Sequence, residues 1–101
     1  MYFGSNLSFL RKRKQLSQAD LANELEIKRS SLSGYELGNS EPNFETLLRF
    51  SNFFKMSIDK LLKVNLQKIS ALYLSQLEQG IDIDVTGGKL RVLATTVDSN
   101  N

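Results

Sequence analysis

The sequence predicts a mainly α-helical protein: five helices in one small domain, then an extra helix and a C-terminal β-hairpin. Apolar residues recur at helical spacing in successive short segments of the first two thirds of the chain. Good N-cap residues precede three of the expected helices: Ser17, Asn43 and Ser57. Near the end, the segment 81–85 alternates apolar and acidic residues before a Gly-Gly turn. The chain of 101 residues is long enough for one small domain with an appendage.

The first helix is expected from about Ser5 to Lys14. Leu7 and Leu10 are assigned to the core, and the basic run 11–14 lies at the C-terminal end, where cations suit the helix dipole. For Lys12 we favour a solvated position. For Arg13 and Lys14 a phosphate contact is an equal alternative.

The next two helices are short and separated by a tight turn at Glu26 and Ile27. Ser17 and Asp20 form an approximate capping box at the start of the first of them. Its expected apolar stripe is Ala19, Leu21, Ala22 and Leu25. The following helix runs from about Lys28 or Arg29 to Leu37, has Leu32 and Tyr35 facing inward, and ends at Gly38 in the left-handed conformation. Its opposite face carries Arg29, Ser30, Ser33 and Gly34.

Residues 39–43 have the composition of a loop, and two more helices complete the first domain. The fourth helix begins after Asn43 and is rich in residues assigned to the core: Phe44, Leu47, Leu48, Phe50, Phe53 and Phe54. The fifth is short, from Ile58 to Lys63, and packs back through Leu61 and Leu62. We place the domain boundary at 1–64 and 65–101.

The second part is expected to contain a helix ending at Gly80 and a β-hairpin. The helix has a broad apolar stripe: Leu66, Ile69, Leu72, Tyr73, Leu74 and Leu77. The hairpin pairs 81–85 with 90–97 across the turn 86–89. An isolated two-stranded hairpin is marginal in water. We therefore interpret residues 65–101 as a dimerisation element or connector; folding back on the same chain is the alternative.

Composition argues against several classes of function. The chain has no cysteine and no histidine, so no disulfide, metal site or cofactor is expected. We find no catalytic combination of residues and predict that the protein is not an enzyme. No apolar run is long enough to cross a bilayer and no secretory leader opens the chain, which favours a cytoplasmic protein. Residues 1–65 carry ten Lys and Arg against seven Asp and Glu, and the basic residues concentrate before residue 30.

The segment 17–42 resembles the helix-turn-helix of lambda-repressor-like (Xre-family) transcriptional regulators, and the resemblance extends from Leu7 to Leu62. The matching residues are Ser17-Gln18, Leu21-Ala22, Leu25, Ile27, Arg29 to Ser33, Tyr35-Glu36, Gly38 and Glu41-Pro42. The sequence departs from the family at two positions. Glu26 stands where glycine is common in the turn, and Gly34 stands where a long polar side chain often reads a base.

The resemblance implies that the third helix enters the major groove of double-stranded DNA while the second lies across the backbone. The expected DNA-binding residues are Ser17, Gln18, Lys28, Arg29, Ser30, Ser31, Ser33, Gly34 and Asn39. Arg29 is the strongest candidate to read a base, because a guanidinium can bind guanine O6 and N7 together. Arg11 and Glu36 are expected to form a structural ion pair between the first and third helices.

The favoured function is a homodimeric, sequence-specific regulator, in particular a repressor, that binds operator half-sites. The stretch 90–99 weakly resembles the connector of LexA-like self-cleaving repressors, which makes a fragment of a longer protein, with a C-terminal domain beyond residue 101, a further expectation. Three alternatives stay open: the antitoxin of a toxin–antitoxin pair, whose residues 66–101 would bind a toxin; a protein-interaction module without DNA binding; and the regulatory part of a self-processing enzyme.

Overall fold

A computed structural model of the chain describes residues 1–69, 71–79, 83–84 and 91–92. The chain divides into two compact units, Met1–Lys68 and Ile69–Asn101. In order, its elements are α1 (Phe3–Arg13), α2 (Gln18–Glu24), α3 (Arg29–Leu37), α4 (Phe44–Phe54), α5 (Ile58–Lys63), the 3-10 turn η1 (Leu66–Lys68), α6 (Ala71–Glu78), β1 (Ile83–Asp84) and β2 (Arg91–Val92). The predominance of helix agrees with the sequence-based prediction.

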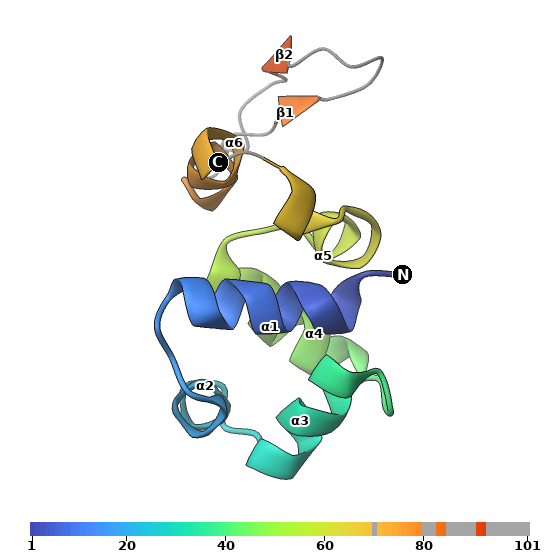
Figure 1. The fold of residues 1–101 in the computed structure, drawn as a ribbon. Coiled ribbons are helices and arrows are strands. Elements are labelled where there is room, and N and C mark those ends of the chain that lie inside the picture. The colour runs from blue at the N-terminus through green and yellow to red at the C-terminus, as the bar shows by residue number, and fades with distance from the viewer. Residues whose placement is uncertain (70, 80–82, 85–90, 93–101) are drawn as a thin grey trace. The chain divides into compact units, whose positions relative to one another are not determined.

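In the first unit, α1 runs across the middle, with α2 and α3 on one side and α5 on the other (Figure 1). Its core consists of fully buried leucine and phenylalanine side chains contributed by every element of the unit: Leu7, Leu10, Leu21, Leu32, Phe50, Phe54, Leu61 and Leu66. The Phe50 ring is central to this core, because the rings of Phe3 and Tyr35 both meet it edge to face, with centroids 5.7 and 6.1 Å away.

The expected helix starts are present in three cases. Side-chain oxygens of Ser17, Asn43 and Ser57 accept hydrogen bonds from backbone N–H groups three residues later, at 3.0, 2.9 and 3.1 Å. The expected start of the first helix was wrong by two residues, because α1 begins at Phe3 and not at Ser5. The two additional residues bring Phe3 into the core.

Three residues assigned to the core are exposed. Ala19 lies on the outer side of α2, and Phe44 and Leu48 on α4 are 85% and 54% exposed. A helix buries only one side, and α4 turns Thr46, Phe50 and Phe54 inward. Phe44 and Leu48 therefore lie on the other side of an apolar helix, which composition alone could not separate from the core side.

A buried asparagine fixes the end of the first unit. Asn6 on α1 is fully buried, and its amide donates hydrogen bonds to the carbonyls of Leu61 and Val64 at 2.8 and 2.7 Å. Its Oδ1 accepts from the backbone N–H of Leu66 at 3.1 Å. These bonds satisfy carbonyls that the end of α5 leaves unpaired. The expected boundary at residue 64 falls inside this hydrogen-bonded segment, and η1 belongs to the first unit.

The expectation of one helix containing all the apolar residues from Leu66 onward was wrong. Leu66 belongs to η1 and is fully buried in the core of the first unit, and α6 begins only at Ala71. Three side chains of α6 are buried, and Leu72 is 68% exposed. The buried residues are Tyr73, Leu74 and Leu77.

In the second unit, β1 and β2 are antiparallel, with Ile83 paired to Val92 and Asp84 to Arg91. Each of these strands has two residues. The remainder of the expected hairpin and the stretch 93–99 lie outside the described residues, so the longer hairpin and the LexA-like connector stay predictions.

Candidate nucleic-acid interface

The first turn of α2 is fixed by a complete capping box. Ser17 Oγ accepts from the Asp20 N–H at 3.0 Å, and the Asp20 carboxylate accepts from the Ser17 N–H at 3.0 Å. The pKa of Asp20 is lowered from its ordinary value. The larger cause is the hydrogen bond from the Ser17 backbone, and the smaller cause is the hydrogen bond with the Ser17 side chain. The start of α2, with Gln18 as its first residue, is therefore well defined.

The turn between α2 and α3 closes without a glycine. Glu26 adopts a left-handed backbone conformation with φ of 57°, and the Ile27 N–H donates to the Ala22 carbonyl at 2.9 Å. A residue with a side chain is strained in this conformation. The departure from the family at Glu26 thus leaves the turn tight, and the cost is local backbone strain.

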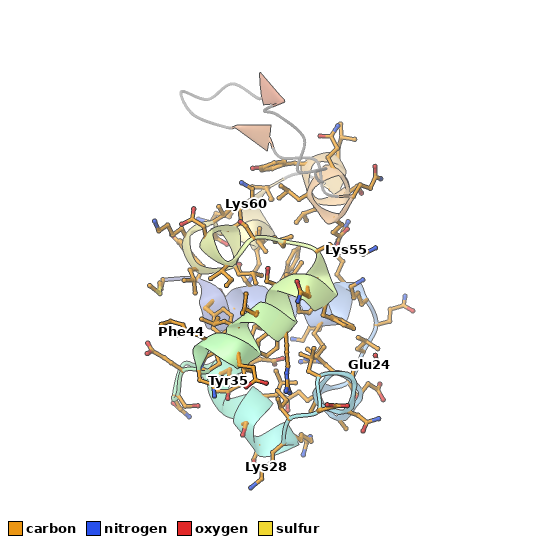
Figure 2. All side chains as sticks on the ribbon, turned by 180° about the vertical axis from the view of Figure 1, so that it is seen from behind. Glu24, Lys28, Tyr35, Phe44, Lys55 and Lys60 are labelled. Carbon is orange, nitrogen blue, oxygen red and sulfur yellow. The ribbon has the colours of Figure 1, made fainter. Side chains whose placement is uncertain are left out.

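Helix α3 is anchored on its inner side and open on its outer side. Leu32 is fully buried, and Gly38 ends the helix in the left-handed conformation with φ of 80°. At its start, Lys28 and Arg29 are exposed. Figure 2 shows Lys28 at one end of the first unit, with Lys55 and Lys60 toward the other end.

None of the nine residues expected to bind DNA is buried. The exposed ones are Ser17, Lys28, Arg29, Ser30 and Asn39, and the half-buried ones are Gln18, Ser31, Ser33 and Gly34. They come from the start of α2, from Lys28 to Gly34 at the start and in the middle of α3, and from Asn39, two residues after the end of α3. Because α2 and α3 pack against each other, these residues belong to one region of the first unit.

The expected ion pair is present and is part of a larger network on α3. Arg11 Nε and Nη2 donate to the two carboxylate oxygens of Glu36 at 2.8 and 3.1 Å, and Nη1 donates to the Leu16 carbonyl at 2.8 Å. The side chains of the pair are 10% and 6% exposed. The hydrogen bond to Glu36 raises the pKa of Arg11 above its already high value, so the guanidinium stays charged.

Gln18 joins the same network. Its Nε2 donates to Glu36 Oε1 at 3.0 Å, which ties the start of α2 to the last turn of α3. The sequence analysis placed Gln18 among the residues that contact DNA. The structure adds a role within the chain, because this hydrogen bond links α2 to α3. A DNA contact by the same side chain stays a prediction.

Two glycines fit against neighbouring elements. A Cβ on Gly34 would lie 2.7 Å from Ser40 Oγ, and one on Gly4 would lie 2.6 and 2.8 Å from the backbone carbonyl oxygens of Tyr35 and Glu36. Gly34 thus has a neighbour within its own chain, and its place among the DNA contacts stays a prediction. Gly4, which the sequence analysis missed, lets α1 lie directly against the end of α3. Its position at the start of an apolar helical repeat was the available signal.

The four basic residues at the end of α1, residues 11–14, have different surroundings. Arg11 is buried in the network, Lys12 is exposed, and Lys14 Nζ lies 5.7 Å from the centre of the Phe53 ring. A cation over an aromatic ring has a protein partner of its own. Arg13 is exposed and also has an interaction within the chain.

Residues 4–67 match the helix-turn-helix domain family. The chain belongs to this family. It is 44% identical over 61 residues to YqaE of Bacillus subtilis (strain 168), named as an uncharacterized HTH-type transcriptional regulator. The aligned segment covers 60% of this chain and 53% of YqaE, so the chain spans about half the length of that relative.

Two solved structures have a similar fold. A transcriptional regulator from Listeria innocua has a TM-score of 0.58 and 31% identity, covering 73% of this chain and 69% of that one. The SinR protein/SinI protein complex has a TM-score of 0.60 over 76% of each chain, at 22% identity. These likenesses agree with the resemblance drawn from residues 7–62.

Other kinds of site find no support in the described part of the chain. Within residues 1–69, 71–79, 83–84 and 91–92, no helix is both long and apolar enough to span a membrane. The same residues include no cluster of three or more acidic, cysteine or histidine side chains that could hold a metal ion.

Proposed function

We propose that this chain is a transcriptional regulator that binds double-stranded DNA in a sequence-specific manner by placing α3 in the major groove. The observation that carries the proposal is the two-sided character of α3. Its inner side is held by Leu32 and by the Glu36 network, while Arg29 and Ser30 at its start are exposed. A rigidly held helix with free donors at its N-terminal end is suited to read base edges.

The candidate DNA-binding residues are assigned to different expected contacts. Arg29 reads a base, and Lys28 beside it contacts phosphate. The hydroxyls of Ser30, Ser31 and Ser33 serve base edges or phosphates. Ser17, Gln18 and Asn39, at the ends of the motif, bind the backbone and fix the register of the protein on the duplex.

The test is selection of bound sites from random duplex DNA, followed by titration of the selected and a scrambled duplex at several salt concentrations. Binding that weakens steeply with salt shows phosphate contacts. Arg29→Ala should lower the preference for the selected duplex by roughly 5-fold or more, because one good base contact supplies about 1–3 kcal/mol of discrimination. Lys28→Ala is the matched control and should weaken binding to both duplexes equally. If Arg29→Ala weakens binding to both duplexes equally, Arg29 contacts phosphate and does not read a base.

We propose further that the chain acts as a homodimer and as a repressor. One helix-turn-helix contacts few base pairs, and dimers of such modules bind half-sites about 34 Å apart. Tyr73 and Leu77 on α6, which the sequence offered as a partner surface, are buried in the single chain. Leu72 is the large apolar residue of α6 that is exposed, and we assign it to the dimer contact together with the segment that follows.

Truncation after Lys68 tests the dimer. This cut keeps Leu66 and the hydrogen bond from its N–H to Asn6 Oδ1, which a cut after Val64 would remove. The full chain should sediment as a dimer at micromolar concentration and the shortened chain as a monomer; two monomers would refute the proposal. Repression is tested with a reporter gene placed behind the selected site. A repressor should lower the expression of this gene when the protein is present.

A protein partner is the second candidate, and one observation favours it. Phe44 and Leu48 are exposed one turn apart on α4, an apolar pair outside the expected DNA region. One of the solved structures with a similar fold is a complex of the SinR protein with the SinI protein. If the chain is a protein-interaction module or antitoxin, Phe44→Ser should abolish a partner complex. Absence of salt-dependent duplex binding would favour the module, because an antitoxin also binds DNA.

A further inference from the structure

Arg49 on α4 reaches across to the end of α2. Its Nη1 donates to the backbone carbonyl of Leu25 at 2.9 Å, and its Nη2 donates to Glu45 Oε2, one turn earlier on α4, at 2.9 Å. The Arg49 side chain is 38% exposed. Sequence reasoning gave this residue no role, since one basic residue among the apolar residues of α4 resembles an ordinary solvated position.

The Leu25 carbonyl belongs to the residue that closes α2. Carbonyls at a helix end have no partner inside the helix and need one from elsewhere. Directly after Leu25 the chain passes through the strained conformation of Glu26 and enters α3 at Arg29. The Ile27 N–H bond to Ala22 fixes one side of this turn, and the Arg49 bond fixes the carbonyl at its beginning.

We propose that Arg49 is a positioning residue for DNA recognition: it holds the turn before α3 and so sets where Arg29 meets the bases. The inference rests on the proposed function. A bidentate contact to a base needs exact placement, whereas attraction to phosphates tolerates small displacements. Loss of the Leu25 bond therefore reduces discrimination between sequences more than general affinity.

The chemistry of the contact favours arginine at this position. A planar guanidinium donates to Leu25 and Glu45 at the same time through two different nitrogens. The Glu45 bond orients the group, and the Leu25 bond carries the effect on the turn. Lysine keeps the charge and can donate to the carbonyl, but it lacks the rigid, planar set of N–H donors that lets a guanidinium bind both partners at once.

The experiment compares R49M, R49K and E45Q in the full chain, using the duplex selected by the wild-type protein and a scrambled duplex of equal length at one salt concentration. R49M should lower the ratio of the two affinities by roughly 5-fold or more, the lower limit for loss of one base contact. R49K should restore affinity for the scrambled duplex and part of the ratio, because it keeps the charge. E45Q is the matched control: it removes the ion pair, leaves the Leu25 bond, and should change the ratio less than about 2-fold.

Amide hydrogen exchange of the free protein gives an independent measure. R49M should accelerate exchange at Glu26 and Ile27, whose N–H groups donate to the carbonyls of Asn23 and Ala22, and leave the core of α1 unchanged, which also establishes that the variant is folded. An unchanged affinity ratio for folded R49M, or an equal fall with E45Q, would overturn the inference. A wild-type protein that binds both duplexes equally would refute the proposed function instead, and the exchange result would then decide whether Arg49 holds the turn.

Discussion

Replacement of Gly4 by alanine tests the close approach of α1 to the backbone of the last turns of α3. The added Cβ would lie 2.6 and 2.8 Å from the carbonyl oxygens of Tyr35 and Glu36, and 3.2 Å from the Glu36 carbonyl carbon. All three atoms are backbone, so relief requires α1 and α3 to move apart. The ring contacts of Phe50 with Phe3 and Tyr35 would open at the same time.

Two opposing effects set the magnitude. Alanine gains up to about 1 kcal/mol over glycine inside a helix, and less near its start. Overpacking of a well-packed contact costs typically 1–3 kcal/mol. Because the clash is with backbone, we expect the cost to exceed the gain, with a net loss of about 1–2 kcal/mol. In a domain of this size that loss corresponds to a fall in Tm of very roughly 4–16 °C.

Gly34→Ala is the matched control, because its added Cβ would meet only Ser40 Oγ, a side-chain atom that can rotate away. This variant should keep the gain in helix propensity and leave Tm unchanged or slightly higher. Thermal unfolding followed by circular dichroism measures both. A Tm for Gly4→Ala at or above that of the wild-type protein, or an equal loss in both variants, would refute the reasoning.

Three further substitutions probe stability in the helix-turn-helix. Arg11→Ala leaves the buried Glu36 carboxylate on α3 without its guanidinium partner and should lower the free energy of unfolding by about 3 kcal/mol or more. Lys12→Ala, the control, should leave the free energy of unfolding almost unchanged. Similar melting temperatures for the two variants would refute the structural role of the ion pair. The folded-state pKa of Asp20 is lowered, so the stability that its carboxylate contributes is present above the unfolded-state pKa and is lost as the pH falls through the folded-state pKa. Asp20→Asn should therefore flatten the decline of stability below about pH 4. Parallel pH profiles for the variant and the wild-type protein would contradict this. Glu26→Gly relieves the strain of the left-handed backbone conformation, whereas glycine also adds conformational entropy to the unfolded chain. The net effect should be a stabilisation of up to about 1 kcal/mol, measured by urea unfolding. A loss of stability would show that the Glu26 side chain has a role of its own.

Local sequence signals determined the starts of α2, α4 and α5 and the end of α3. Ser17, Asn43 and Ser57 stand directly before apolar repeats, and each caps its helix as expected. Capping is a contact between near neighbours, so composition and spacing suffice to predict it. The position of Gly38 likewise ends α3, because glycine adopts the left-handed conformation without steric cost. The Arg11–Glu36 pair came from family resemblance, not from spacing.

Contacts between distant residues were decided only by the tertiary structure. The exposure of Phe44 depends on which side of α4 meets the core, and an apolar helix does not specify that by itself. Asn6 and Arg49 read as ordinary polar residues, yet they complete the hydrogen bonding of helix ends 55 and 24 residues away. Those partners become visible only after packing brings the carbonyls within reach, because an unpaired helix end has no sequence signal of its own. The sequence by itself therefore determined the residues of α3 that are proposed to contact DNA, and the tertiary structure decided which residues hold that helix in place.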